Sequence, residues 1–387
     1  MAQDPRVYLD YNATTPLDPR VLEAMLPYLR DVFGNASSRQ HAFGRRARDG
    51  VETARQQVAR LIGAHADEIV FTSGGTESNN LAIKGLADAC EGRGRHVITC
   101  KTEHKAVVDP CEWLEGHGFE VTWLEPDAAG RVAAQQVADA ITDRTVLITL
   151  MTANNETGTL HPIAEIGRIA RPRGILLHTD AVQGVGKMPL DVEQMQVDLL
   201  SSSAHKLYGP KGIGCLYVRR GVKLACQVCG GGHEGGLRSG TLNVPGIVGF
   251  GAACDLAPDE AERHRIAGLR DRLHERIRTA LSDVTLNGAR QQRLCNTLNL
   301  SFGYVKAEPL MKRMPRTAVS TGSACSSASD EPSHVLAAMG VSQELIEASI
   351  RFSLGRFTTG AEIDAAAEET VRAVRELREM NPLHPSE

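Results

Sequence analysis

Aromatic residues are scarce in this sequence, where phenylalanine, tyrosine and tryptophan make up only 4% of 387 residues. So few rings provide no evident stacking platform for single-stranded nucleic acid. The formal net charge of −4 also lacks the positive excess of a general nucleic-acid or membrane-surface binder. Both features argue against direct binding to nucleic acid or to a membrane.

Long apolar runs are missing as well. No stretch approaches the length of a membrane span, and residues 1–16 lack the basic and apolar segments of a secretory signal. The nine cysteines, an odd number spread along the chain, are expected to be reduced thiols. With ordinary hydrophobic (42%) and charged (23%) fractions, the composition predicts a soluble cytoplasmic protein of enzyme size.

Short apolar runs alternate with helical patterns through the first two-thirds of the chain. The runs that indicate strands are 68–72, 96–100, 119–124, 145–151, 175–179, 197–203 and 214–218. Segments such as 77–92 and 132–141 have the spacing of amphipathic helices. This alternation predicts an α/β fold with a largely parallel sheet, whose ligands bind at the carboxyl ends of the strands.

The length of the chain favours two domains, and the sequence changes character after about residue 260. The later elements are predicted to be a charged helix at 262–283, a strand at 296–302 and a closing helix at 363–380. We therefore expect an N-terminal segment, 1–15, that packs with the small domain, a large domain, 16–260, and a small α+β domain, 261–387.

A lysine and an aspartate stand out among the residues at predicted strand ends. Lys206 follows a Ser-rich strand and precedes Gly-Pro and Gly-x-Gly, a pattern that can hold its amine close to a phosphate. Asp180 ends an earlier strand and can pair with a protonated ring nitrogen. Pyridoxal phosphate (PLP) requires both groups. A lone lysine is usually a surface residue, so it is the pair that favours this cofactor.

A glycine-containing turn between a predicted strand and helix is a candidate phosphate site. Gly75 lets the backbone approach a ligand, Thr76 offers a hydroxyl, and a helix N-terminus favours an anion. By itself the pattern is more often an ordinary helix cap. Ser203 and His205, at another strand end, complete the predicted site.

Four further polar residues are candidates for contacts with the cofactor or substrate. His104 could stack on a cofactor ring or move protons, or be structural. Asn155 and Gln183 could contact a ring hydroxyl, although Asn155 also fits a turn. Arg351 is a candidate fork for a substrate carboxylate, and a surface ion pair is the alternative.

Cys325 lies in a segment rich in Ser, Ala and Gly, residues 316–333, which we expect to be a mobile loop. An accessible thiol there can ionise and act as a nucleophile. Cys226 and Cys229 form a lone CxxC without a second pair of zinc ligands. Five other cysteines fit the role of small core residues: Cys90, Cys100, Cys215, Cys254 and Cys295.

A series of motifs in one order extends over nearly the whole chain. They are YLDYNATTP (8–16), GNASS (34–38), TSGGTESNN (72–80), TEHKAV (102–107), NNETGT (154–159), HTDAVQ (178–183), AHKLYGPKGIG (204–214), RSGT (238–241), GSACSSAS (322–329) and RFSLGRFTT (351–359). With these motifs the chain resembles cysteine desulfurases of the NifS/IscS type, PLP enzymes of the class V aminotransferase family. The resemblance implies fold type I of PLP-dependent transferases.

The resemblance also implies a role for each candidate residue. Lys206 would form the Schiff base, Asp180 would pair with the ring nitrogen, and His104 would stack on the ring. Contacts to the ring would come from Asn155 and Gln183, and contacts to the phosphate from Gly75, Thr76, Ser203, His205 and the partner subunit's Thr241. Arg351 and Asn155 would hold the substrate carboxylate, and Cys325 would receive the sulfur.

The activity implied is conversion of L-cysteine to L-alanine with a persulfide on Cys325. The enzyme would be a homodimer that supplies an iron–sulfur scaffold or tRNA thiolation. It would have no metal of its own, although Cys325 could ligate a cluster transiently through a partner. The alternatives are a selenocysteine lyase or an aminotransferase of the same family, and a non-catalytic scaffold. An aminotransferase has no use for the cysteine loop.

Three positions depart from the family pattern. Gly235 replaces a usual arginine and bears on the loop that precedes Thr241. Ala204 replaces a common glycine beside the expected phosphate site. The segment KRMPR, 312–316, is unusually basic and reflects either a particular acceptor or a solvated face.

Overall fold

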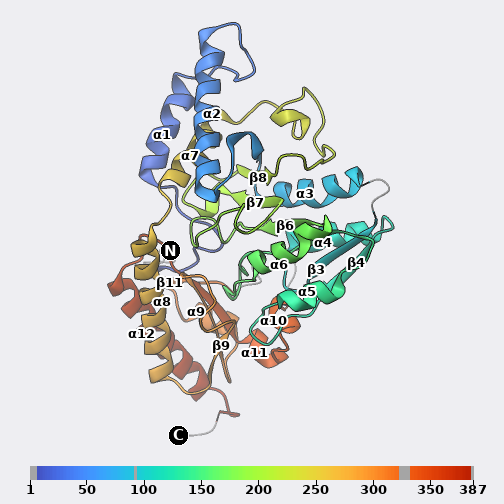
Figure 1. Ribbon diagram of the computed structural model, residues 1–387. Coiled ribbons are helices and arrows are strands. Elements are labelled where there is room, and N and C mark those ends of the chain that lie inside the picture. The colour runs from blue at the N-terminus through green and yellow to red at the C-terminus, as the bar shows by residue number, and fades with distance from the viewer. Residues whose placement is uncertain (1–6, 91–93, 322–331, 385–387) are drawn as a thin grey trace.

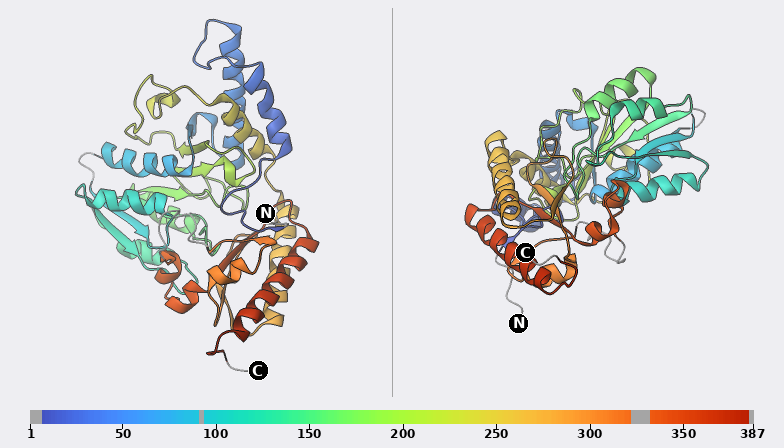
Figure 2. Two further views of the ribbon diagram at one scale, coloured as in Figure 1. Left: turned by 180° about the vertical axis from the view of Figure 1, so that it is seen from behind. Right: turned by 90° about the horizontal axis from the view of Figure 1, so that it is seen from below.

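The computed structural model describes residues 7–90, 94–321 and 332–384. In these ranges the two largest hydrophobic clusters lie in different parts of the molecule (Figures 1 and 2). The larger part holds the long sheet, and the smaller part holds a short sheet covered by two long helices.

A seven-stranded sheet forms the centre of the larger part. Its strands, in spatial order, are β2 (Ile69–Thr72), β8 (Gly214–Val218), β7 (Leu199–Ser203), β6 (Leu176–Asp180), β5 (Thr145–Thr149), β3 (His96–Cys100) and β4 (Glu120–Leu124). Only β8 pairs in an antiparallel manner, with β2 and β7. The prediction of a mostly parallel α/β sheet is therefore confirmed.

Helices cover both faces of this sheet because its buried strands carry apolar side chains on both sides. Val97 and Leu147 pack towards the helices on one face, while Ile98 and Ile148 pack towards those on the other. The first face carries α3 (Gly75–Ala89) and α4 (Lys105–Glu115). The second carries α5 (Ala134–Ala140), α6 (Ile163–Ala170), α2 (Ala42–Ile62) and α7 (Val244–Asp255), with α1 (Pro19–Arg30) packed on α7.

The smaller part is an antiparallel sheet with two long helices beside it (Figure 1). The sheet order is β12 (Ser349–Ser353), β10 (Thr297–Phe302) and β9 (Val284–Asn287). The long helices are α8 (Glu260–Ala280) and α12 (Gly360–Glu379), and the short ones are α9 (Ala307–Lys312), α10 (His334–Ala338) and α11 (Gln343–Glu347). The N-terminal strand β1 (Val7–Tyr8) pairs in parallel with β11 (Thr317–Ala318).

Side-chain caps fix where the two long helices begin. Asp259 accepts a hydrogen bond from the backbone N–H of Glu262 at the start of α8. Thr359 and Glu362 form a reciprocal capping box at the start of α12. Each cap satisfies backbone donors that the first helical turn leaves unpaired.

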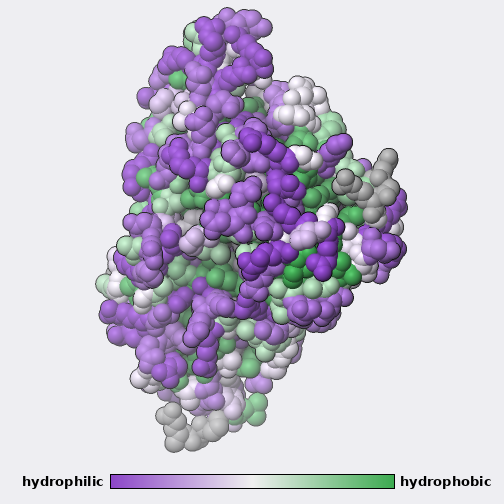
Figure 3. Space-filling view, viewed as in Figure 1, coloured by the Kyte–Doolittle hydropathy of each residue, from purple (hydrophilic) through white to green (hydrophobic). Residues whose placement is uncertain are grey.

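The visible surface is mainly hydrophilic, and hydrophobic residues show mostly in the middle of the face in Figure 3. None of the helices in the described ranges is long and apolar enough to cross a bilayer.

Candidate active site

A cavity of about 250 Å³ lies at the carboxyl ends of the central strands. The loops that follow β2, β3, β5, β6 and β7 each contribute to it, as expected for a parallel sheet. The lining includes nine of the predicted site residues: Gly75, Thr76, His104, Asn155, Asp180, Gln183, Ser203, His205 and Lys206. Residues predicted separately along the sequence therefore lie around one cavity.

Asp180, the last residue of β6, is held in place by two hydrogen bonds. Asn79 donates from Nδ2 to its Oδ2 (2.7 Å), and the backbone N–H of Val182 donates to its Oδ1 (2.9 Å). The carboxylate is buried and lines the cavity, so it can accept a hydrogen bond from a protonated ring nitrogen. Asn79 lies within the quoted motif TSGGTESNN, but no role was predicted for it.

The start of α3 faces the end of β7 and forms a small concave surface. Gly75 is the first residue of α3, and a Cβ there would lie 2.6 Å from Val182 Cγ2. Only glycine therefore keeps this surface open. The helix N-terminus supplies backbone N–H groups and a favourable dipole for an anion. Thr76 and Ser203 line the same cavity.

His205 lies beside this surface as a neutral ring. Burial and the neighbouring Lys206 lower the pKa of His205 to about 4. Its Nδ1 is 3.2 Å from Thr14 Oγ1, and its backbone oxygen accepts hydrogen bonds from Thr15. The imidazole can therefore donate or accept a hydrogen bond without bringing a buried charge.

The side chain of Lys206 contacts the N-terminal segment of the chain. Its Nζ donates to the backbone oxygens of Asn12 and Ala13, the latter at 2.8 Å. Asn12 is fully buried, and its Nδ2 donates to the Asn155 oxygen (3.1 Å) and to Thr297 Oγ1 (2.9 Å). Asn12 thus connects the lysine with the loop after β5 and with β10. The motif YLDYNATTP contained it, but only the fold reveals its contacts.

His104 is the N-cap of α4, and this position sets its tautomer. Its Nδ1 accepts the backbone N–H of Ala106 (3.0 Å). In the neutral ring the proton must then lie on Nε2. His104 therefore presents an N–H donor in the cavity that it lines.

Two side-chain amide oxygens in the cavity wall have no hydrogen-bond partner in the described part of the chain. Within the described ranges, Asn155 Oδ1 and Asn79 Oδ1 are buried without a hydrogen bond. Buried polar atoms are normally satisfied, so such orphans mark a place for a polar ligand. Together with the carboxylate of Asp180, the glycine-lined helix start and the Lys206 amine, they fit PLP.

Arg351, in β12, is fully buried and is not part of the cavity lining. Its Nη2 donates to Asp10 Oδ1 (2.8 Å) and its Nη1 to the backbone oxygen of Asn155 (3.1 Å). The ion pair that was the alternative at this position exists, although it is buried at the arginine rather than on the surface. The second bond places the guanidinium next to Asn155, which lines the cavity.

Thr241 is exposed and does not line the cavity of its own chain. The loop before it is tied to α3, because Arg238 Nε donates to Glu77 Oε1 (2.8 Å). Gly235 has a left-handed backbone (φ +64°) with open space around its α-carbon. Glycine adopts this conformation without the strain that an arginine would carry.

Cys325 lies outside the described residues. The chain on either side of the undescribed segment is anchored near the cavity. Ser320 pairs through its backbone with Arg351, and Ser333 Oγ donates to Glu156 Oε2 (2.6 Å). His334 Nε2 lies 2.9 Å from the backbone oxygen of Glu103.

The expectation that every cysteine is a reduced thiol is wrong for one pair. Cys226 and Cys229 are joined by a disulfide. Their α-carbons are 5.7 Å apart in an exposed loop, which is ordinary spacing for this bond. No cluster of three metal-ligating side chains exists among the described residues. Cys295, predicted as a core residue, is only partly buried, whereas Cys90, Cys100, Cys215 and Cys254 are buried.

The two other unusual positions have simple surroundings. The methyl group of Ala204 packs in the main hydrophobic core and not in the cavity. In the basic segment, Lys312 pairs with Glu308 (2.6 Å) and Arg313 with Glu376 (3.9 Å). These exposed pairs favour a solvated face.

Comparison with known proteins places this geometry in context. Residues 7–366 match the family model "Aminotransferase class-V". Cysteine desulfurase IscS of Anaeromyxobacter dehalogenans (strain 2CP-C) is 57% identical, over 98% of this chain and 95% of that protein. Cysteine desulfurase of Mus musculus is 51% identical, over 97% and 83%.

Solved structures show the same relationship. A NifS-like protein superposes with a TM-score of 0.90 at 37% identity, covering 96% of this chain and all of the other. A structure described as SspA in complex with cysteine has a TM-score of 0.82 at 41% identity, covering 91% of this chain and all of that one.

Proposed function

This chain belongs to the aminotransferase class-V family and is a PLP-dependent cysteine desulfurase of the IscS type, and we propose that the cavity residues and Cys325 carry out the reaction. L-cysteine is the substrate, and L-alanine and a persulfide on Cys325 are the products. The observation that carries this assignment is the meeting of Lys206, Asp180 and the α3 N-terminus around one cavity.

PLP, when bound, withdraws electrons from the substrate Cα and so stabilises negative charge there. The chain would hold it at three points. Asp180, fixed by Asn79 and Val182, would accept a hydrogen bond from the ring nitrogen. The first turn of α3, with Ser203 and His205, would bind the phosphate. His104 would contact the ring, with the proton of its neutral imidazole on Nε2.

Lys206 supplies the amine that would hold the cofactor covalently, and it moves protons at the substrate. Its position is set by the backbone oxygens of Asn12 and Ala13. Hydrogen bonds to these carbonyl oxygens orient the amine. An amine held at the substrate in this way can act as a base and as an acid within one cycle.

Arg351 binds the substrate carboxylate together with Asn155. The guanidinium already contacts the backbone of Asn155, and Asp10 holds its other arm. A guanidinium group that is already held at two points loses little further conformational freedom when it binds a carboxylate.

Cys325 receives the sulfur. Its thiolate attacks the sulfur of L-cysteine, a sulfur–sulfur bond forms, and the carbon–sulfur bond breaks. The electron pair of that bond stays with the carbon, which takes up a proton to give alanine. We further propose a cytoplasmic homodimer that passes the sulfur to an iron–sulfur scaffold or to tRNA thiolation.

The direct test is incubation of the purified protein with L-cysteine and a reductant, followed by assay of alanine and sulfide. Both should form in equal amounts. L-selenocysteine serves as the comparison, because a selenocysteine lyase would turn it over and spare L-cysteine. Formation of keto acid in place of alanine would indicate an aminotransferase and contradict the proposal.

Thr241 should complete the phosphate site of a second subunit. It is exposed in its own chain, and Arg238 of the same loop is bound to α3. Thr241→Ala and Lys206→Ala homodimers should both be impaired. In a mixed dimer one site carries both changes and the other carries neither, so activity should recover to roughly a quarter of wild type for random exchange. Mixed chains that exchange, as shown by mass, yet stay inactive would contradict a shared site.

A further inference from the structure

Lys187 is a cation at the back of the active site that the proposed mechanism does not use. It lies in the loop after β6 and is partly buried. Its Nζ makes hydrogen bonds to two neutral side chains and forms no ion pair with a carboxylate among the described residues. Partly buried lysines without a carboxylate are costly, so the position calls for a functional reason.

The main partner of Lys187 is Gln183. Lys187 Nζ donates to Gln183 Oε1 at 2.7 Å, and Gln183 Nε2 donates to the Asn12 oxygen at 3.0 Å. An ammonium group can only donate, so the amide atom that faces it must be the oxygen. These two hydrogen bonds fix the orientation of the Gln183 amide, with Oε1 towards Lys187 and Nε2 towards the Asn12 oxygen.

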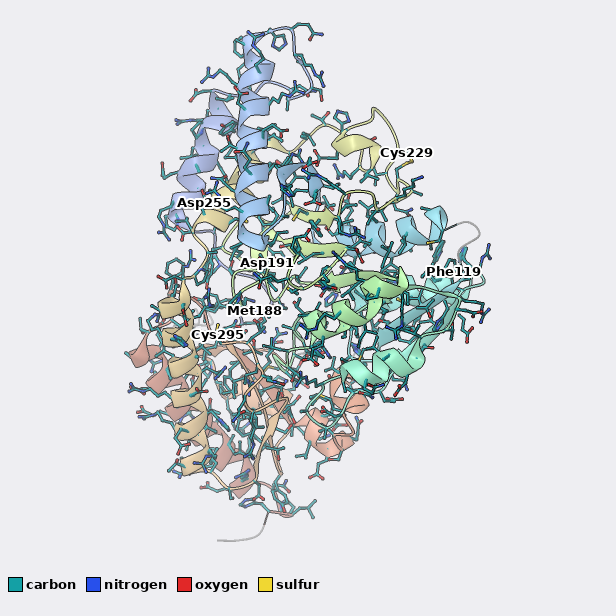
Figure 4. All side chains as sticks on the ribbon, in the orientation of Figure 1. Phe119, Met188, Asp191, Cys229, Asp255 and Cys295 are labelled. Carbon is teal, nitrogen blue, oxygen red and sulfur yellow. A yellow bond between two sulfur atoms is a disulfide. The ribbon has the colours of Figure 1, made fainter. Side chains whose placement is uncertain are left out.

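The charges around Lys187 are mostly of its own sign. Burial, Lys206 and Arg351 lower its pKa to about 7, and only Cys295 opposes them. The Cys295 thiol donates to the Lys187 backbone oxygen (3.6 Å), and Figure 4 shows Cys295 beside Met188, the next residue in the chain. Burial and the neighbouring positive charges therefore make the ammonium form of Lys187 electrostatically costly at this position.

We propose that Lys187 is a positioning residue that holds the Gln183 amide so that the second N–H of Nε2 would donate to the ring hydroxyl oxygen of bound PLP. This inference rests on the proposed function, because Gln183 lines the cofactor cavity. Without Lys187, only the hydrogen bond from Nε2 to the Asn12 oxygen holds the amide among the described residues, so the amide rotates more easily and can present its oxygen, which repels another oxygen. Lys187 itself touches neither cofactor nor substrate.

The test compares three variants in cofactor-free protein reconstituted with PLP. Lys187→Met removes the donor at similar length, and Lys187→Arg keeps one. Lys306→Met is the matched control, since the side chain of Lys306 is 74% exposed. PLP affinity is measured by titration of the visible absorbance. Lys187→Met should weaken binding about tenfold, the ratio that one hydrogen bond to a charged group supplies. Lys187→Arg should retain most of the affinity, and the control all of it.

A second comparison separates positioning from simple support of the fold. In a double-mutant cycle, Gln183→Leu should add little to Lys187→Met, because both remove the same contact. The melting temperature of cofactor-free Lys187→Met should stay within about 2 °C of wild type, because the lost contacts are offset by relief of a buried charge. A fall in melting temperature that accounts for the lost affinity, or additive effects in the cycle, would overturn the proposal.

The outcome also distinguishes this inference from the proposed function. A wild-type protein that binds no PLP would sink the proposed function itself. Normal PLP binding by the wild type, together with Lys187→Met binding within twofold of it, would overturn only the role of Lys187.

Discussion

Replacing Lys206 by alanine should abolish turnover of L-cysteine while PLP remains bound in the cavity. Lys206 is the amine that lines the cavity wall, held by the backbone oxygens of Asn12 and Ala13. We expect alanine and sulfide production to fall by roughly 10⁴-fold, the upper end of what one positioned acid–base group contributes. The cofactor should stay because Asp180 and the α3 N-terminus do not depend on the lysine.

Activity, bound PLP and visible absorbance check this expectation together. Wild-type protein should be yellow, and Lys206→Ala should have a different visible spectrum because the bond from lysine to cofactor is gone. Lys223→Ala, an exposed lysine elsewhere on the larger part, is the matched control and should keep wild-type activity. Turnover by Lys206→Ala within tenfold of wild type would mean that another amine serves the cofactor.

Cys325→Ala should stop sulfur release without preventing L-cysteine from binding. The other cysteines are poorly suited to attack the substrate, because a nucleophilic thiol must ionise and be accessible. Burial raises the pKa of Cys100 and of Cys215 to about 12, and it also raises the pKa of Cys254 well above its usual value. Cys226 and Cys229 are joined in a disulfide.

With Cys325→Ala, the production of sulfide and alanine should therefore fall to the level measured without enzyme. L-cysteine should still change the visible absorption spectrum of this variant. The control is the double variant Cys226→Ser with Cys229→Ser, which should keep activity within about twofold, since these cysteines belong to no cluster of three metal-ligating side chains among the described residues and do not line the cavity. Sulfide production by Cys325→Ala combined with loss of activity in the double variant would place the nucleophile in the CxxC loop.

Two strands, each next to an edge strand of the sheet, could be predicted closely from sequence. β3 and β8 begin and end where expected, at 96–100 and 214–218, and all five residues of each are buried. Helix α2 was not predicted. It is rich in arginine and contains Gly44 and Gly50, which lower helix propensity. Its helix is stabilised instead by packing on α7.

The chemistry of the site was predictable where the sequence places a polar residue at a strand end, as for Asp180 and Lys206. The hydrogen-bond network that surrounds these residues was not predictable. Asn12 contacts Asn155 and Thr297, which are 143 and 285 residues away, and no local pattern encodes such pairings. The Cys226–Cys229 bond likewise depends on the loop conformation. The domain boundary at residue 260 stays a prediction.

The ion pair between Asp10 and Arg351 has a consequence for the biosynthesis of this protein. The two residues are 341 positions apart, and at 5–20 residues per second a ribosome takes roughly 20–70 s to make the second after the first. Gly75 and His205 can take their places during that time, but Asp10 waits for its partner. A nascent chain that stops before residue 351 therefore contains the residues of the anion-binding surface but lacks the arginine that pairs with Asp10 of the N-terminal segment.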